Sequence, residues 1–314
     1  MKIVITDGYT LNPGDLSWQP FHELGEVTYY DRTKPEELVA RCREANIIVT
    51  NKTPIQEPVM LTAPGLKLIA VTATGYNVVD TAAARKHGIS VCNVPEYGTH
   101  SVAQHTFALL LELTNHVGRH AQSVREGEWV RAIDWSYARA PIIELRDKTL
   151  GIVGLGRIGN QAAAIARAFG MNVIYHRGRA EKAQAAAVGL EALFSTSDFV
   201  SLHCPLKPEN QEFVNKALLS HMKPSAYLIN TSRGQLIHEP DLAEALKRGV
   251  LAGAALDVLS KEPPPPDHPL LGLSNCLITP HNAWLSFEAR QRILQITLGN
   301  VKAALGGKPQ NVVN

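Results

Sequence analysis

Three ionisable side chains in the second half of the chain have types that suit one reaction. Arg233, Glu262 and His281 each follow an apolar run that is typical of a strand. An arginine holds a carboxylate or a keto oxygen with its charged fork. A histidine gives a proton to a forming alkoxide near neutral pH, and a carboxylate beside it favours its protonated form and orients the ring. Together these residue types suit hydride transfer to a 2-keto acid.

A glycine-rich motif precedes these residues in the chain. Residues 154–159 read GLGRIG, after the apolar run 150–153 and before a segment typical of a helix. In a strand–turn–helix unit the first glycine permits the tight turn, the second lets the backbone approach a pyrophosphate, and the third lets helix and strand pack. The helix N-terminus presents free N–H groups to the phosphates. The candidate dinucleotide-binding residues are Gly154, Gly156, Arg157, Ile158 and Gly159.

The elements expected after residue 148 form a second βαβ series. We predict strands at 149–153, 172–175, 199–202, 226–230, 252–256 and 276–278, and helices at 158–169, 216–220 and 239–248. Six strands suit a complete doubly wound nucleotide-binding domain. Ligands of open α/β sheets bind beyond the carboxyl ends of the strands. We therefore expect Arg233, Glu262 and His281 in one crevice.

The first hundred residues show the same rhythm, which indicates a parallel sheet. We predict strands at 2–6, 45–50, 67–72 and 89–93, and helices at 35–44 and 79–87. One long, mostly apolar helix is expected at 100–119, as a link between two domains. Residues 126–141 carry three large aromatic side chains in an irregular context and are expected to form an arm that packs on another subunit. A last helix, 287–305, should return to the first domain because the second sheet is already complete.

The bulk properties exclude several classes of protein. A chain of 314 residues favours two domains. The net charge of +2 gives no reason to expect nucleic acid or a membrane as a partner. No apolar run approaches the roughly 18 residues of a membrane span, and the apolar N-terminal stretch is too short for a signal peptide. The 4 cysteines are far apart without a C-x-x-C pair, as in a cytoplasmic protein with reduced thiols. We expect no bound metal.

Six stretches of the chain, in this order, resemble the D-isomer-specific 2-hydroxyacid dehydrogenase family over essentially its whole length. They are residues 74–80, 154–159, 203–206, 230–234, 255–263 and 279–284. Residues 6–18 and 280–290 are similar to the glycerate dehydrogenase/hydroxypyruvate reductase branch. Asn77 and Gln104 depart from the family pattern, which usually has an aspartate and a glutamate there.

The resemblance implies a role for each matching residue. Arg233 would bind the carboxylate and the keto oxygen of the substrate. His281 would be the acid/base and Glu262 its partner. The backbone around Thr74 and Gly75 would cradle the substrate carboxylate.

Four further residues are implied to line the cofactor site. Asp257 would lie near the nicotinamide carboxamide, and the others would line the cleft: Cys204, Pro205 and Thr231. The implied fold is α/β, with two Rossmann-like, doubly wound parallel-sheet domains and a cleft between them. Residues 1–98 plus 286–314 would form the substrate-binding (catalytic) domain, and residues 99–285 the dinucleotide-binding domain. Family members are typically homodimers joined through the long helix and the arm.

The end of the second strand bears on the choice between NAD and NADP. The family's common form has an acidic residue there, which meets the ribose 2′-OH of NAD. Here the sequence from 175 to 179 is YHRGR, without a carboxylate. Arg177 and Arg179 could instead meet the 2′-phosphate of NADP, and His176 could touch the cofactor. We expect NADP or NAD, with NADP slightly favoured.

The sequence therefore predicts an NAD(P)-dependent reductase. It would convert hydroxypyruvate to D-glycerate, or glyoxylate to glycolate. Two alternatives stay open. One is a non-enzymatic, dinucleotide-sensing protein like the corepressors that share this fold. The other is a dehydrogenase of another acid, such as phosphite, D-lactate or formate, although formate dehydrogenases have a glutamine where Glu262 stands.

Overall fold

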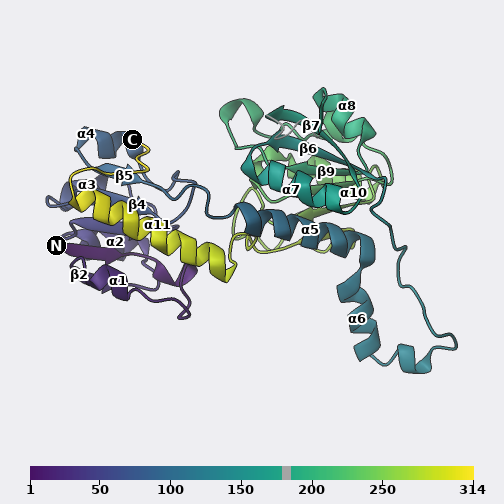
Figure 1. Ribbon diagram of the computed structural model, residues 1–314, viewed down its shortest axis with the longest axis horizontal. Helices are drawn as coiled ribbons and strands as arrows, with labels where there is room; N and C mark the ends of the chain where they lie inside the picture. Colours follow the sequence, from purple (N-terminus) through teal and green to yellow (C-terminus); the bar gives the residue numbers. More distant parts are fainter. Residues whose placement is uncertain (179–184) are drawn as a thin grey trace. The chain divides into compact units, whose positions relative to one another are not determined.

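The chain folds into two compact units, which are shown in Figure 1. The computed structural model describes residues 1–178 and 185–314. Unit 1 comprises Met1–Gly98 with Leu285–Asn314, and unit 2 comprises Thr99–Trp284. The second boundary falls one residue before the expected one. Arg179, a predicted cofactor residue, lies outside the described residues.

Unit 1 is built on a parallel sheet of five strands in the order β2-β1-β3-β4-β5. The strands are β1 (Lys2–Ile5), β2 (Glu26–Tyr29), β3 (Ile47–Thr50), β4 (Leu68–Val71) and β5 (Ser90–Cys92), and the short helices are α1 (Gln19–His22), α2 (Pro35–Cys42), α3 (Glu57–Thr62) and α4 (Thr81–Lys86). Strands β3 and β4 are buried along their whole length, as expected for a sheet covered on both faces. Strand β2 was not predicted, because it is a largely exposed edge strand without an apolar run.

Both ends of the chain contribute to unit 1. Helix α11 (Phe287–Leu305) packs near β4, which confirms the prediction that it returns to the first domain. Beyond it, Val312 pairs antiparallel with Cys92, and the N–H of Val313 donates to the carbonyl of Val91 at 2.8 Å. The C-terminal residues therefore cover the β5 edge of the sheet.

Unit 2 contains a parallel sheet of seven strands in the order β12-β11-β10-β9-β6-β7-β8. The strands are β6 (Thr149–Leu155), β7 (Asn172–Gly178), β8 (Ala186–Ala187), β9 (Phe199–Leu202), β10 (Tyr227–Asn230), β11 (Gly253–Leu256) and β12 (Cys276–Ile278). The sheet contains all six predicted strands, and the short edge strand β8 is additional. The chain starts at the middle of the sheet with β6 and winds outward in both directions, as in a doubly wound domain.

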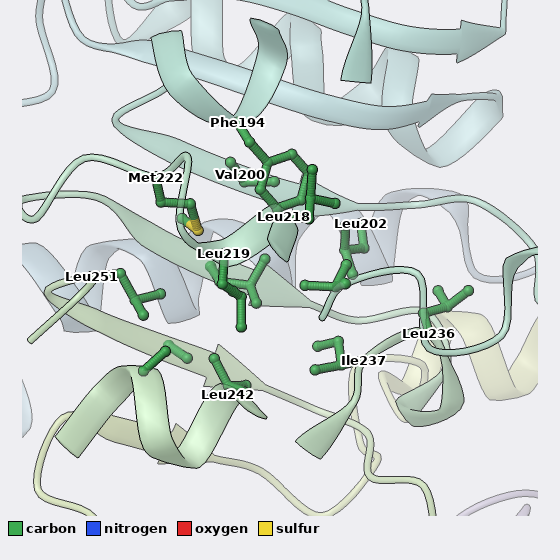
Figure 2. Packing of buried hydrophobic residues seen from close by; sticks show 14 of the residues in the cluster. Phe194, Val200, Leu202, Leu218, Leu219, Met222, Leu236, Ile237, Leu242 and Leu251 are labelled. Atoms are coloured by element: carbon green, nitrogen blue, oxygen red, sulfur yellow. The ribbon is translucent and has the colours of Figure 1, made fainter. Parts of the chain in front are cut away.

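Helices cover both faces of this sheet. On one face α5 (Thr99–Asn115) and α7 (Arg157–Ala168) bury residues such as Phe107 and Ala162. On the other face α8 (Leu190–Thr196), α9 (Lys216–Leu219) and α10 (Glu239–Lys247) form the apolar cluster of Figure 2, in which Phe194, Leu219 and Leu242 are fully buried. The sheet is thus fixed from two sides, and its strand ends are held in register.

The long helix expected at 100–119 is two helices. His116 has a φ of 49°, which ends α5, and α6 (Val117–Arg125) follows in another direction (Figure 1). Helix α5 buries eight side chains, whereas α6 buries only Ser123. The prediction of one continuous helix was wrong because the polar composition after residue 115 has no core to pack against.

An arm follows α6 and projects away from the sheet of unit 2 (Figure 1). It includes a 3-10 turn, η2 (Trp129–Arg131), and an irregular segment whose Ile133 and Trp135 side chains are 100% and 94% exposed. Within the described part of the chain, no helix combines the length and the apolar character that crossing a membrane requires.

Candidate functional site

The strand register of unit 2 places the predicted site residues along one edge of its sheet. Five residues lie in register across adjacent strands, each paired with the next: Val153 (β6), Leu202 (β9), Asn230 (β10), Leu256 (β11) and Ile278 (β12). The next backbone N–H groups continue this alignment, because Asp257 donates to Asn230 and Thr279 donates to Leu256. The loops that carry the predicted residues therefore all begin at the same edge.

The structure brings Glu262 and His281 into direct contact. The Nδ1 atom of His281 lies 2.6 Å from the Oε2 atom of Glu262. The other carboxylate oxygen, Oε1, accepts the backbone N–H of Leu259 at 3.0 Å. Because Glu262 occupies Nδ1, the Nε2 atom is the ring nitrogen left for a reacting group. A histidine held in this way can exchange a proton in a defined direction.

Asp257 anchors the loop that carries His281. Its carboxylate accepts the hydroxyl of Thr279 at 2.6 Å and the backbone N–H groups of Asn282 and Ala283, each at 2.9 Å. His281, between these donors, has a φ of 52°. Burial acts to raise the pKa of Asp257, but the hydrogen bonds, including one from His105, outweigh it and hold the pKa below its usual value. A contact of Asp257 with the nicotinamide remains a prediction.

Arg233 lies on the turn after β10, and its side chain is exposed. The side chain of Asn230 fixes this turn by donating to the carbonyl of Arg233 at 2.8 Å and accepting the N–H of Ser232 at 2.9 Å. The Ser232 hydroxyl donates to the carbonyl of Cys204 at 2.6 Å. The guanidinium itself donates to the carbonyl of Ser232 at 2.7 Å.

The Arg233 turn packs directly on the segment that carries Glu262. A Cβ atom at Gly234 would overlap the carbonyl of Leu259 and the nitrogen of Ser260. Gln235 donates to the carbonyl of Ser260 at 2.8 Å. The close approach requires glycine at 234 and ties the two loops together.

The glycine turn fits a bound dinucleotide. Gly154 has a φ of 96°, and a Cβ there would lie 2.5 Å from the nitrogen of Cys204, whereas one at Gly159 would lie 2.5 Å from the oxygen of Gly154. The fold itself therefore requires these two glycines. A Cβ at Gly156, the N-cap of α7, meets nothing within 4 Å, and its φ of −87° suits any residue. The described residues give no packing reason for glycine here, and the backbone is left open to a ligand. Arg157 and Ile158 open the helix beside it.

The end of β7 lies next to this turn. Gly178 pairs with Leu155, and His176 pairs with Val153. The Nδ1 atom of His176 lies 3.0 Å from the carbonyl oxygen of Val188, which occupies that side of the ring. Arg177 is exposed. Burial raises the pKa of the nearby Cys204 thiol, and the positive charge of Arg177 opposes this with a smaller effect.

Two further cofactor candidates lie near the carboxyl ends of β9 and β10. Pro205 follows Cys204, and its carbonyl accepts the side-chain N–H of Asn210 at 2.9 Å. Thr231 begins the Arg233 turn, and its hydroxyl lies 3.2 Å from that of Thr106 on α5. Both residues thus belong to the edge that carries the glycine turn.

Thr74 and Gly75, the predicted substrate residues, belong to unit 1 and follow the carboxyl end of β4. The hydroxyl of Thr74 donates to the carbonyl of Val94 at 2.8 Å, and Asn93 donates to the carbonyl of Thr74 at 2.8 Å. The loop is therefore held in one shape. Its role in binding substrate stays a prediction.

Sequence reasoning missed the support that α5 gives to the site. Ser101 donates to the carbonyl of Ala283 at 2.9 Å, and the Nε2 atom of His105 lies 3.1 Å from the hydroxyl of Thr279. Together with Thr106, these residues hold both the His281 loop and the Arg233 turn. The signal in the sequence was polar side chains at helical spacing within an apolar helix.

One family model matches residues 107–283 of the chain. It describes the NAD-binding domain of D-isomer specific 2-hydroxyacid dehydrogenases.

Relatives and solved structures match the whole length. A hydroxypyruvate reductase of Blautia hydrogenotrophica is 47% identical over 321 residues, with 100% of both chains covered. A glycerate dehydrogenase of Methylorubrum extorquens is 39% identical, with 99% of this chain and 98% of that one covered. The NADPH-dependent glyoxylate/hydroxypyruvate reductase of Sinorhizobium meliloti, solved with NADP and malonate, has a TM-score of 0.84 at 29% identity, with 99% of this chain and 96% of that one covered.

Proposed function

Because the chain belongs to the D-isomer specific 2-hydroxyacid dehydrogenase family, we propose that it reduces hydroxypyruvate to D-glycerate, or glyoxylate to glycolate. It is an NAD(P)-dependent oxidoreductase of the glycerate dehydrogenase/hydroxypyruvate reductase branch. The observation that carries the mechanism is the 2.6 Å contact between His281 and Glu262, on the same sheet edge as Arg233 and the glycine turn.

The side chains of this edge have separate roles in the mechanism. The bound nicotinamide cofactor supplies the hydride. His281 delivers a proton from Nε2 to the substrate oxygen, and Glu262 holds its ring and stabilises the imidazolium. Arg233 binds the carboxylate and the keto oxygen of the substrate and offsets the negative charge that develops on that oxygen.

The remaining substrate and cofactor contacts follow from the same proposal. The backbone at Thr74 and Gly75 would donate to the substrate carboxylate. The N-terminus of α7 would face the pyrophosphate, with Gly156 giving the closest approach. Unit 1 with its returning helix would thus be the substrate-binding domain, and unit 2 the dinucleotide-binding domain.

NADP is the favoured cofactor within this proposal. The end of β7, beside the glycine turn, offers the exposed Arg177 and no carboxylate. An arginine there suits a 2′-phosphate, whereas an acidic residue would suit the 2′-OH of NAD. Replacing Arg177 and Arg179 together by alanine should weaken NADPH binding more than NADH binding, as measured by cofactor fluorescence. Equal losses would mean that neither side chain meets the phosphate.

Further parts of the proposal concern partners and location. We propose a homodimer joined through the arm, because exposed apolar side chains such as Ile133 and Trp135 mark interfaces. The small net charge argues against nucleic acid as a partner. The unpaired cysteines support a reducing, cytoplasmic location.

A turnover assay tests the reaction. The purified protein should oxidise NADPH or NADH in the presence of hydroxypyruvate or glyoxylate, and the loss of cofactor absorbance measures the rate. Parallel assays with pyruvate and other short 2-keto acids give the substrate preference. If neither cofactor is oxidised with any of these acids, the result contradicts the proposed reaction and favours a dinucleotide sensor.

A further inference from the structure

We propose that Glu239 and His268 are positioning residues that hold Glu262 against His281. This inference rests on the proposed function, since it concerns the same acid/base pair. Neither residue is part of the site described above. Both are buried, with 8% and 7% of their surface exposed. They contact each other, and Glu239 also contacts Ser260 in the loop that carries Glu262.

The Glu239 carboxylate, in the first turn of α10, has three donors. Its Oε1 atom accepts the backbone N–H of Ser260 at 2.7 Å. Its Oε2 atom accepts the Ser260 hydroxyl and lies 3.0 Å from the Nε2 atom of His268. Nδ1 of His268 accepts the N–H of Leu270 at 3.4 Å, so Nε2 is the protonated nitrogen and donates to Glu239.

These bonds fix the segment 259–262 at Ser260. Ser260 is bound through its N–H and hydroxyl to Glu239 and through its carbonyl to Gln235. The preceding residue, Leu259, gives its N–H to Oε1 of Glu262, which leaves Oε2 for His281. The orientation of the Glu262 carboxylate therefore depends on the backbone that Glu239 holds.

A carboxylate at 239 accepts from all three donors at once. A carboxylate accepts on both oxygens, whereas an amide accepts on one and donates from the other end. A glutamine at 239 would point an N–H group at the N–H or hydroxyl of Ser260 or at His268. Buried donors without acceptors are unfavourable, so the segment would shift.

The described hydrogen bonds of His281 and its loop involve three other ionisable groups. Glu262 contacts its ring directly. Asp257, which follows β11, and His105, on α5, contact neighbouring residues of its loop. Glu239 and His268 contact neither the ring nor this loop in any hydrogen bond described. The shortest route of described hydrogen bonds from these residues to His281 runs through the segment 259–262 and Glu262.

A double-mutant cycle tests this dependence. Glu239→Gln should lower kcat about tenfold or more in the wild-type background, with the KM for cofactor unchanged. In a Glu262→Gln background the same substitution should lower kcat less than about threefold, because the group it positions is already altered. Equal losses in the two backgrounds would show a general structural role and overturn the inference. Glu244→Gln, on the exposed face of α10, is the matched control and should leave kcat unchanged.

Hydrogen exchange gives a second readout that needs neither cofactor nor turnover. In the apo protein the amide of Leu259 should exchange faster in Glu239→Gln and in Glu262→Gln than in the wild type or in Glu244→Gln. Unchanged exchange in Glu239→Gln would overturn the inference. Should that variant be unfolded by circular dichroism, Ser260→Ala removes only the hydroxyl bond and must show the same pattern. A wild type without turnover would contradict the proposed function, and the exchange result would still decide the inference.

Discussion

Two histidines that follow strands of the same sheet show how surroundings decide the role of a side chain. His203, after β9, lies 2.9 Å from the hydroxyl of Ser201, and burial lowers its pKa to about 4. It is therefore neutral at physiological pH and cannot act as a cationic acid. His281, after β12, is partly exposed and lies against a carboxylate. Only the second histidine has a carboxylate that orients its ring for proton delivery.

His281→Ala should lower kcat by about two to four orders of magnitude, because the proton donor is removed. Cofactor affinity, measured by fluorescence titration, should stay close to that of the wild type. His221→Ala, an exposed histidine of the same unit, is the control and should behave like the wild type. A collapse of cofactor binding in His281→Ala would show that the side chain has been given the wrong role.

Reading single residues in the sequence identified the reacting groups but not their supports. Glu262 and His281 stood out because each follows a predicted strand, and the structure places them in contact. Glu239 and His268 did not, because their contacts with Ser260 and with each other join residues 21 and 29 positions apart. No local pattern marks such pairs. Such pairs can be recognised only from a structure that shows where the loops between the strands run.

At the scale of elements, the site depends on parallel strands that end in register. The positions and lengths of these strands along the chain were largely predictable from short apolar runs. The path of each connecting loop was not, because it is set by tertiary hydrogen bonds such as those of Asp257. This residue directly follows β11 and accepts N–H groups of the loop after β12. The position of His281 therefore depends on how these two strands are aligned.

Asp257→Asn should destabilise the fold by about 1–3 kcal/mol, since an amide cannot accept all the donors that the carboxylate does. It should also lower kcat. Urea unfolding and steady-state kinetics measure the two effects, and the exposed Asp267→Asn is the control. A variant with wild-type stability and kcat would show that the anchor is dispensable.

The same anchor predicts a pH dependence of stability. Hydrogen bonds hold the pKa of Asp257 below its usual value in the folded protein. Its contribution is therefore complete above the unfolded pKa of about 3.9, and it is lost as the pH falls through the lower folded value. Between about pH 5 and pH 3 the wild type should lose more free energy of unfolding than Asp257→Asn. Equal losses in urea titrations would contradict this.

The strand–turn–helix unit contains two glycines that the fold needs, and a third, Gly156, that we propose a ligand needs. Gly156→Ala should leave the melting temperature nearly unchanged but weaken cofactor binding at least about tenfold, because the new methyl group occupies the space open to a phosphate. Gly159→Ala should instead lower stability by about 1–3 kcal/mol through overpacking. Thermal unfolding and cofactor titration of both variants distinguish these cases. Full cofactor affinity in Gly156→Ala would place the pyrophosphate elsewhere.

At the scale of the whole molecule, the arm of unit 2 is ordered without a core of its own. The hydroxyls of Ser123 and Tyr137 are 2.7 Å apart, and the indole N–H of Trp129 donates to the carbonyl of Trp135 at 2.9 Å. The arm keeps its shape through such bonds while its large apolar side chains face outward. Its aromatic composition was visible in the sequence, but the break at His116 that redirects it was not.

Replacing Ile133 and Trp135 together by serine should convert a dimer into a monomer, because the substitutions remove apolar surface from the proposed interface. Light scattering after size-exclusion chromatography measures the mass. Leu61→Ser changes another exposed apolar side chain, 63% exposed on unit 1, and should leave the dimer intact. A monomeric wild type, or a double variant that stays dimeric, would rule out this interface.

The pairing of Val312 and Val313 with β5 has a consequence for biosynthesis. Unit 2 is one continuous stretch and can fold as soon as it leaves the ribosome. The sheet of unit 1 stays open along its β5 side until the residues that follow unit 2 have been synthesised, so it is completed later than unit 2 although most of it precedes unit 2 in the chain.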